Sequence, residues 1–270
     1  MRAFHRAVVL SSLALSLAAG AKGPSKTEDR DVAEFDAVSV ESGVHASIAI
    51  GGRAVEVTAA ADVLQRLVTE VKKGVLHLRF ERRSGWMHFG HDGEVTVKVR
   101  TPHLRAVSAS GGAHADVTAT TEGRVQLDAS GGGTVNVASA PAHELKVDAS
   151  GGATIAVGGI DAEQVTASGS GGAVLKLSGR ADKAELSFSG GTVIKAQRFD
   201  VRDASVDGGG GGEARVHVSQ AVRGSVSGGS SLRLDGKPKA RISTSGGGEV
   251  IYAEGRSAPS AEKQADDEED

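Results

Sequence analysis

The chain has 270 residues, of which 39% are apolar but only 3% aromatic, with 38 glycines and no cysteine. The lack of cysteine excludes disulfides, thiolate metal sites and thiol catalysis. The formal net charge of −3 lacks the positive excess that is typical of nucleic-acid binding. The scarcity of aromatic side chains favours thin, stacked β-layers over a thick core.

The first 21 residues have the three parts of a secretory signal peptide. A basic head with Arg2 and Arg6 precedes an apolar run over residues 7–19, and residues 19–21 (Ala-Gly-Ala) suit cleavage. The apolar run is too short to span a bilayer comfortably, so no transmembrane segment is expected once the signal is cleaved. We therefore expect an exported protein that is periplasmic or extracellular, including the cell surface.

The next segments are expected to be a leader and a cap. Residues 22–34 are polar and predict a flexible leader. From Phe35 onward, apolar and polar residues alternate with the period of a β-strand, and helical spacing over residues 61–68 predicts one short helix. Residues 35–104 are therefore predicted to form a β-rich N-terminal cap.

One stretch of this cap does not follow the alternation. It holds the only tryptophan, and Trp86, Met87, His88, Phe89 and His91 are candidates for a surface-contact loop. The alternative is a loop whose aromatic side chains pack onto the cap. His88 and His91 form an H-x-x-H pair, but a zinc site needs three or four convergent ligands, so no metal site is predicted.

A Ser-Gly-Gly type of signature recurs at intervals of 18 to 20 residues between residues 108 and 249. The first of the two adjacent glycines in each copy is Gly111, Gly131, Gly151, Gly171, Gly190, Gly210, Gly228 or Gly246. The residues six positions later are apolar apart from the hydroxyl of Tyr252, and they include Val137, Val157 and Leu177. The segments on both sides of each glycine therefore have the alternation of strands.

This repeat predicts an all-β solenoid over residues 105–254. One unit cannot bury its apolar face alone, so copies must stack with each strand beside its equivalent in the next coil of about 20 residues. Glycine suits a corner that needs a positive φ or has no room for a Cβ. An antiparallel sandwich or barrel is the alternative, but its hairpins would usually carry Asn-Gly or Asp-Gly turns at a constant repeat phase.

Residues 255–270 include the run AEKQADDEED, which has no apolar residue beyond alanine. Such a like-charge run predicts a disordered, solvated acidic tail. Nothing in it supplies the turn geometry of a calcium loop.

Three segments together resemble a known bacterial family. They are the opening FDAVSV-ESGVHASIAI, the stretch VTAAADVLQRLVTEVKKGVLHLRF and the repeated SGGA-x-V-x-V units. They are similar to the head GIN domain, a domain of unknown function also labelled an autotransporter adhesin head, over roughly residues 35–252. The resemblance implies an exported protein with a right-handed parallel β-helix and, through the label alone, an adhesin-like role.

The sequence departs from that label at its C-terminus. A self-exporting autotransporter needs a membrane barrel of alternating strands of about ten residues. The acidic run stands there instead, which favours a periplasmic or released protein.

The sequence favours a binding protein over an enzyme. Phosphate-loop and H-E-x-x-H motifs are absent from it, so no cofactor, catalytic residue or metal ligand is predicted. Asp128 and Asp148 share a repeat phase and should stack near Lys146, but few aromatic platforms are available for a sugar-cleaving cleft.

We expect a non-enzymatic, adhesin-like or surface-binding protein of the bacterial envelope. Its expected partner is an envelope or extracellular glycan or protein, and not a nucleic acid; no oligomeric state is indicated. The alternatives are a carbohydrate-active enzyme (a polysaccharide lyase or hydrolase) on the same scaffold and a purely structural envelope spacer.

Overall fold

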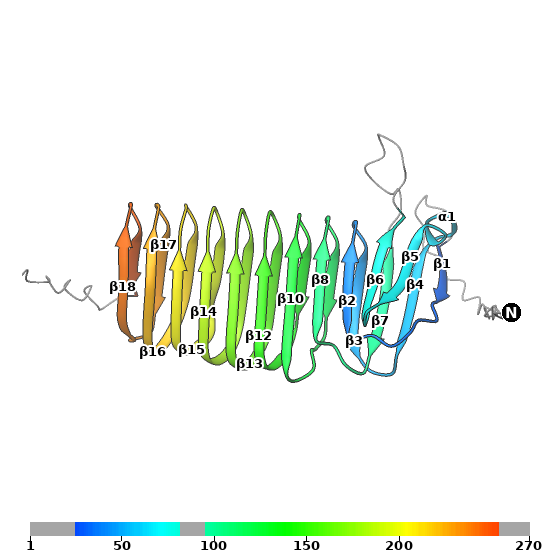
Figure 1. Cartoon of the computed structure of the whole chain (residues 1–270), viewed down its shortest axis with the longest axis horizontal. Coiled ribbons are helices and arrows are strands. Elements are labelled where there is room, and N and C mark those ends of the chain that lie inside the picture. Colours follow the sequence, from blue (N-terminus) through cyan, green and yellow to red (C-terminus); the bar gives the residue numbers. More distant parts are fainter. Residues whose placement is uncertain (1–24, 82–94, 254–270) are drawn as a thin grey trace, which may run out of the picture.

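The computed structural model describes residues 25–81 and 95–253. Strands lie side by side along the long axis of the molecule, with β18 near one end and β1, β4, β5 and α1 at the other (Figure 1). Strands make up 69% of the structure and helix 2%, and the stack forms a β-solenoid of about seven turns with coils of about 20 residues. The predicted fold class is confirmed.

The elements follow in chain order. They are β1 (Ser25–Asp29), β2 (Ala37–Glu41), β3 (His45–Ile50), β4 (Ala54–Ala60), α1 (Ala61–Leu64), β5 (Leu67–Lys72), β6 (Val75–Phe80), β7 (Thr96–Thr101), β8 (Ala106–Ser110), β9 (His114–Val117), β10 (Arg124–Ser130), β11 (Thr134–Val137), β12 (Ala140–Ala149), β13 (Thr154–Gly169), β14 (Val174–Phe188), β15 (Val193–Gly208), β16 (Glu213–Ser227), β17 (Ser231–Asp235), β18 (Lys239–Ser245) and β19 (Glu249–Tyr252).

Each coil has one strand that enters a glycine corner and one that leaves it, and we call these the incoming and outgoing strands. In one coil, β8 enters the Gly111-Gly112 corner and β9 leaves it. From β13 to β16, each long strand contains the outgoing segment of one coil and the incoming segment of the next. Equivalent strands pair in parallel along the stack, as in β8–β10–β12 and β9–β11–β13.

The apolar columns predicted from the repeat fill the interior. Val137 is the register partner of Val157, which is in turn the partner of Leu177. All three side chains are buried, and one continuous core cluster runs through the coils from Phe35 to Leu234. Alternate residues of each strand face this interior. The alternation of apolar and polar residues in the sequence therefore places the apolar side chains of successive coils on top of one another.

The corner glycines stack on one another and adopt the left-handed conformation. The first glycine of all eight copies has a positive φ, between +54° at Gly131 and +83° at Gly210. A Cβ added to Gly210 would lie 2.7 Å from the backbone nitrogen of Gly190, a distance that real Cβ atoms essentially never reach. The column therefore needs glycine for two reasons, backbone conformation and close approach between coils.

The parallel stack extends into residues 35–104, where we predicted a cap. Strand β2 pairs in parallel with β8, and β3 pairs in parallel with β9. Between β2 and β3, Ser42 has a φ of +59°, and a Cβ added to Gly111 would lie 3.4 Å from the backbone nitrogen of Ser42. Ser42-Gly43 is thus a further corner in the column, with serine at the left-handed position.

The chain then folds back over the end of the stack. Strands β6 and β7 pair in parallel with β2 and β3 and add a further layer outside them. Antiparallel pairing of β5 with β6 and of β4 with β7 supplies the cover that a solenoid end needs. The predicted helix over residues 61–68 is shorter than expected, because β5 already begins at Leu67.

The leader differs from the expectation of a flexible segment. Residues Ser25–Asp29 form β1, which pairs antiparallel with β4 over five residue pairs. The guanidinium of Arg30 also donates a hydrogen bond to the carbonyl of Leu64 at 3.0 Å. A polar sequence suits this position, because an edge strand with both faces near water gains its order from backbone pairing rather than from burial.

The predicted signal peptide (residues 1–21) and the predicted acidic tail (residues 255–270) lie outside the described residues. In the part that the structure describes, no helix is long and apolar enough to cross a membrane.

Candidate functional site

The predicted contact loop lies outside the described residues. Trp86, Met87, His88, Phe89 and His91 all fall between residues 82 and 94. The described flanks are β6, which ends at Phe80, and β7, which begins at Thr96. The role of this loop therefore stays a prediction.

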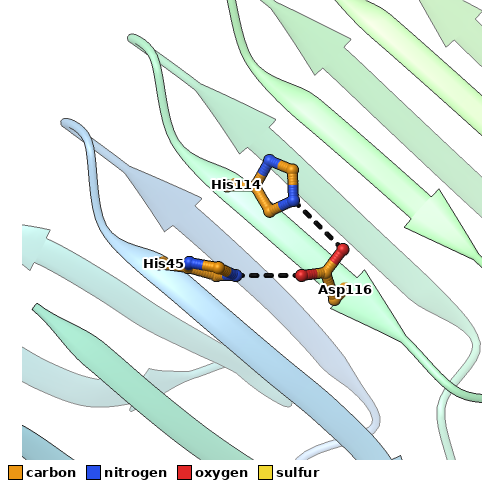
Figure 2. A group of neighbouring side chains, drawn as sticks. All are labelled: His45, His114 and Asp116. Carbon is orange, nitrogen blue, oxygen red and sulfur yellow. Dashed lines mark hydrogen bonds and ion pairs between the residues drawn. The ribbon is translucent and has the colours of Figure 1, made fainter.

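A cluster of two histidines and one aspartate lies on the outgoing face near the covered end of the stack (Figure 2). His45 on β3 and His114 on β9 are direct register partners, and their ring centroids lie 4.7 Å apart. The Nε2 atom of His45 lies 2.9 Å from Oδ2 of Asp116, and the Nε2 atom of His114 lies 3.0 Å from Oδ1. We call these three residues the histidine cluster.

The corners explain why these side chains meet. His45 and His114 each follow a corner by the same number of residues, counted from Ser42 and from Gly111. Asp116 lies two residues after His114 on the same strand, so both side chains face outward. The in-register pairing of β3 with β9 then places residues 69 positions apart in the sequence next to each other.

Asn136 on β11 completes the polar surroundings of the cluster. It is the register partner of Asp116, and its Nδ2 donates a hydrogen bond to Oδ1 of Asp116 at 2.9 Å. Partial burial alone would raise the pKa of Asp116, but the hydrogen bonds from Asn136 and His45 and the charge of His114 lower it below its ordinary value. The carboxylate is therefore held in its charged form, which is the form that accepts hydrogen bonds or a cation.

Sequence reasoning missed the histidine cluster. His45 and His114 are separated in the sequence by the whole fold-back of β4 to β7. The spacing of His88 and His91, in contrast, is that of a local metal-ligand pattern. The available signal was the ESGV segment at residues 41–44, which has the form of a corner with serine in place of the first glycine. Aligning it with the later corners places His45 and His114 in one column.

A groove of about 640 Å³ runs along the stack from the histidine cluster, at the ends of the outgoing strands. Its polar and charged lining residues are Ser47, Asp116, Thr118, Asn136, Lys176, Ser178, Lys195, Gln197 and Arg198. Its apolar lining includes Val117, Val137, Val157 and Leu177, whose side chains are largely buried in the core. We call this feature the outgoing groove.

The two ends of the outgoing groove differ in charge. Asp116 lies at one end, whereas Lys176, Lys195 and Arg198 lie at the other. Lys176 and Lys195 are direct register partners on β14 and β15, so two ammonium groups project from neighbouring strands. Among the described residues, no carboxylate lies within ion-pair distance of these three cations.

The incoming face carries the aspartates considered as candidates for sugar cleavage. Asp128 and Asp148 are register partners, as their shared repeat phase predicted. Burial raises the pKa of Asp128, and the charge of Asp148 raises it further. Lys146 lies 3.0 Å from Asp148, and the surrounding hollow is lined mainly by serine, alanine and glycine.

Three solved structures share this fold over most of both chains. A "Putative lipid binding protein" from Parabacteroides distasonis ATCC 8503 is 19% identical, with a TM-score of 0.77, covering 86% of this chain and 97% of its own. A "putative adhesin" from the same organism is 22% identical, with a TM-score of 0.77, covering 86% and 98%. A "putative adhesin" from Parabacteroides merdae ATCC 43184 is 18% identical, with a TM-score of 0.69, covering 86% and 97%.

At these identities the structures show the shared solenoid fold and nothing of the ligand. Curated proteins give no match to the chain. The family model described as "Putative auto-transporter adhesin, head GIN domain" matches residues 34–238, from the first strand of the parallel stack almost to its last coil. This match covers most of the chain and confirms the resemblance seen in the sequence: the protein belongs to the head GIN domain family.

Proposed function

We propose that this protein is a non-enzymatic, exported, adhesin-like binding protein of the bacterial envelope, and that the outgoing groove binds an extended anionic glycan. The observation that carries the proposal is the group formed by Lys176, Lys195 and Arg198 at one end of that groove. Cations without carboxylate partners keep their full attraction for an incoming anion.

The form of the outgoing groove supports a chain-like ligand. It crosses strands from β3 to β15, so its long direction follows the axis of the stack. Hydroxyl and amide groups of Thr118, Asn136, Ser178 and Gln197 line it and can donate and accept hydrogen bonds with sugar hydroxyls. An extended glycan can contact several coils at once, whereas a compact small molecule would contact one or two.

The rigidity of the scaffold also favours binding. The lining residues lie on or directly after strands that pair with a neighbour on both sides. Little side-chain or loop ordering is therefore needed when a ligand binds, and that ordering is a main cost of association. The family description, with its words auto-transporter adhesin, agrees with a contact role at the cell surface, and the predicted signal peptide agrees with export.

The proposal predicts salt-sensitive binding to anionic glycans. In a glycan array, the protein should bind acidic polysaccharides over neutral ones, and added NaCl should weaken the binding because it screens exposed charges. A triple variant with Lys176→Ala, Lys195→Ala and Arg198→Ala should lose about tenfold in affinity, since three exposed ion contacts at about 0.5 kcal/mol each give that ratio. The matched control with Lys183→Ala, Arg223→Ala and Lys239→Ala removes the same charge from the other face and should bind normally.

Four results would contradict the proposal. Equal loss in both triple variants would show an effect of net charge alone. Loss only in a variant with Trp86→Ala and His88→Ala would place recognition in the predicted loop instead of the outgoing groove. Release of reducing sugar would support the enzyme alternative, and silence in every assay would support the structural spacer.

A further inference from the structure

We propose that His45, His114 and Asp116 form a binding site for a divalent transition-metal ion, with Zn²⁺ as its natural probe. The inference does not depend on the glycan proposal, because that proposal rests on Lys176, Lys195 and Arg198 at the other end of the outgoing groove. Among the described residues, this is the group of at least three histidine or acidic side chains whose ligand atoms all lie within 4.8 Å of one another.

The two nitrogen–oxygen distances in the histidine cluster are close to those between ligands of one small ion, and all the ligand atoms lie within 4.8 Å of one another. Ligand atoms that share a tetrahedral zinc at 2.0–2.1 Å lie about 3.3 Å apart. The two contacts between imidazole Nε2 and carboxylate oxygen are 2.9 Å and 3.0 Å, so each needs to lengthen by only a few tenths of an ångström. Figure 2 shows both imidazole rings directed at the same carboxylate, which is the convergence that a metal site requires.

The backbone already holds the ligands in place. His45 and His114 are paired across two hydrogen-bonded strands, and Asp116 lies on the same outward face of β9. The backbone nitrogen of His114 donates to the carbonyl of Val44 at 2.9 Å, which ties the two strands together next to the site. Binding therefore requires side-chain adjustment but no rearrangement of the fold.

Asn136 acts as a positioning residue for the carboxylate. Its Nδ2 lies 2.9 Å from Oδ1 of Asp116 and 3.2 Å from Nε2 of His114. Nε2 of His114 cannot both donate to Asp116 and accept from Asn136, so these groups compete for one hydrogen position. A cation at Nε2 removes the competition, because the ring nitrogen then offers its lone pair to the metal while Asn136 still donates to the carboxylate.

The donor set indicates the class of ion. Two imidazole nitrogens and one carboxylate oxygen suit Zn²⁺, and also Cu²⁺, Ni²⁺ and Co²⁺, better than Ca²⁺ or Mg²⁺, which prefer oxygen ligands. The three side chains are between 36% and 45% exposed, so an ion can reach them from solvent. Three protein ligands leave at least one coordination position for water or for a group of a bound partner.

Two other contacts between histidine and carboxylate serve as internal controls. His143 lies 3.0 Å from Glu163, with both side chains more than 70% exposed, and His217 lies 4.0 Å from Asp200. Each offers one imidazole and one carboxylate and so lacks the third ligand. Neither pair should hold an ion at concentrations that saturate the histidine cluster.

The test is calorimetric titration of ZnCl₂ into the full-length, untagged protein after chelator treatment and dialysis. We expect one ion bound per chain. Asn136→Ala should lower the affinity for Zn²⁺ about tenfold or more, because it removes the positioning partner of the carboxylate. His45→Gln and His114→Gln each remove a ligand and should lower the affinity further. His143→Gln and a double variant with His88→Gln and His91→Gln should bind like the wild type.

A second measurement needs no variant. Co²⁺ bound by nitrogen and oxygen ligands with low coordination number gives visible d–d absorption bands, and these should appear at one equivalent and disappear on addition of Zn²⁺.

Binding that persists when both His45 and His114 are replaced by glutamine would overturn the proposal. So would a lack of binding by the wild-type protein, or loss of binding confined to the variant of His88 and His91.

Discussion

Replacing Leu175 by alanine is expected to lower the free energy of unfolding by about 2–5 kcal/mol. Leu175 is fully buried at the centre of the stack, where its register partners are Ile155 in the preceding coil and Ile194 in the following one. Truncation removes apolar contacts with both neighbours and leaves a cavity that backbone-paired strands cannot close. In a repeat structure this weakens two coil–coil interfaces with one change.

The matched control for this variant is Lys176→Ala, at the next position of the same strand. Lys176 is exposed, so its truncation should change the free energy of unfolding by no more than about 0.5 kcal/mol. Urea denaturation followed by far-UV circular dichroism measures both variants. Similar losses of unfolding free energy in the two variants would contradict the placement of Leu175 on the inward face and Lys176 on the outward face of β14.

The second large effect is expected at the glycine corner. Gly210→Ala forces a Cβ into a backbone with a φ of +83° and places it 2.7 Å from the backbone nitrogen of Gly190. The left-handed conformation costs about 1–2 kcal/mol for a residue with a Cβ. The clash with a neighbouring backbone, which cannot rotate away as a side chain can, adds about 1–3 kcal/mol.

Gly132→Ala separates these two costs. Gly132 has the same φ of +83°, but a Cβ there would meet nothing within 4 Å. Gly132→Ala should therefore lower the free energy of unfolding only by the conformational cost of about 1–2 kcal/mol. In thermal or urea unfolding, the wild type should be the most stable, Gly132→Ala intermediate and Gly210→Ala the least stable. Equal destabilisation of the two variants would show that the corner column contributes no close contact between coils.

The repeat region could be predicted from the sequence because its contacts recur at a nearly constant separation of about 20 residues. Val137, Val157 and Leu177 recur at one phase, and a period of 20 residues leaves parallel stacking as the arrangement that buries all of them together. For the corner glycines, the sequence left two reasons open, a positive φ or a lack of room for a Cβ, and both apply at Gly210.

The N-terminal coils could not be predicted in the same way. Strands β2 and β3 stack on β8 and β9 only after the fold-back of β4 to β7, so their pairing is long-range. Ser42 stands where the other corners have glycine, which hides the corner from a search for paired glycines. The histidine cluster was missed for the same reason, because His45 belongs to a coil that the repeat pattern did not include.

Cysteine cross-linking tests the register between coils most directly. Because the chain has no natural cysteine, only the two introduced cysteines can form a disulfide within it. Ser47, Asp116 and Asn136 are consecutive register partners on β3, β9 and β11. Adjacent strands lie about 4.8 Å apart and strands two apart about 9.6 Å, while a disulfide joins Cα atoms no more than about 7 Å apart. Mild oxidation should therefore cross-link the pair Ser47→Cys with Asp116→Cys and leave Ser47→Cys with Asn136→Cys reduced, as judged by mass spectrometry. Failure of the first pair to cross-link, or cross-linking of the second in its place, would contradict the stacking of β3 on β9 and with it the histidine cluster.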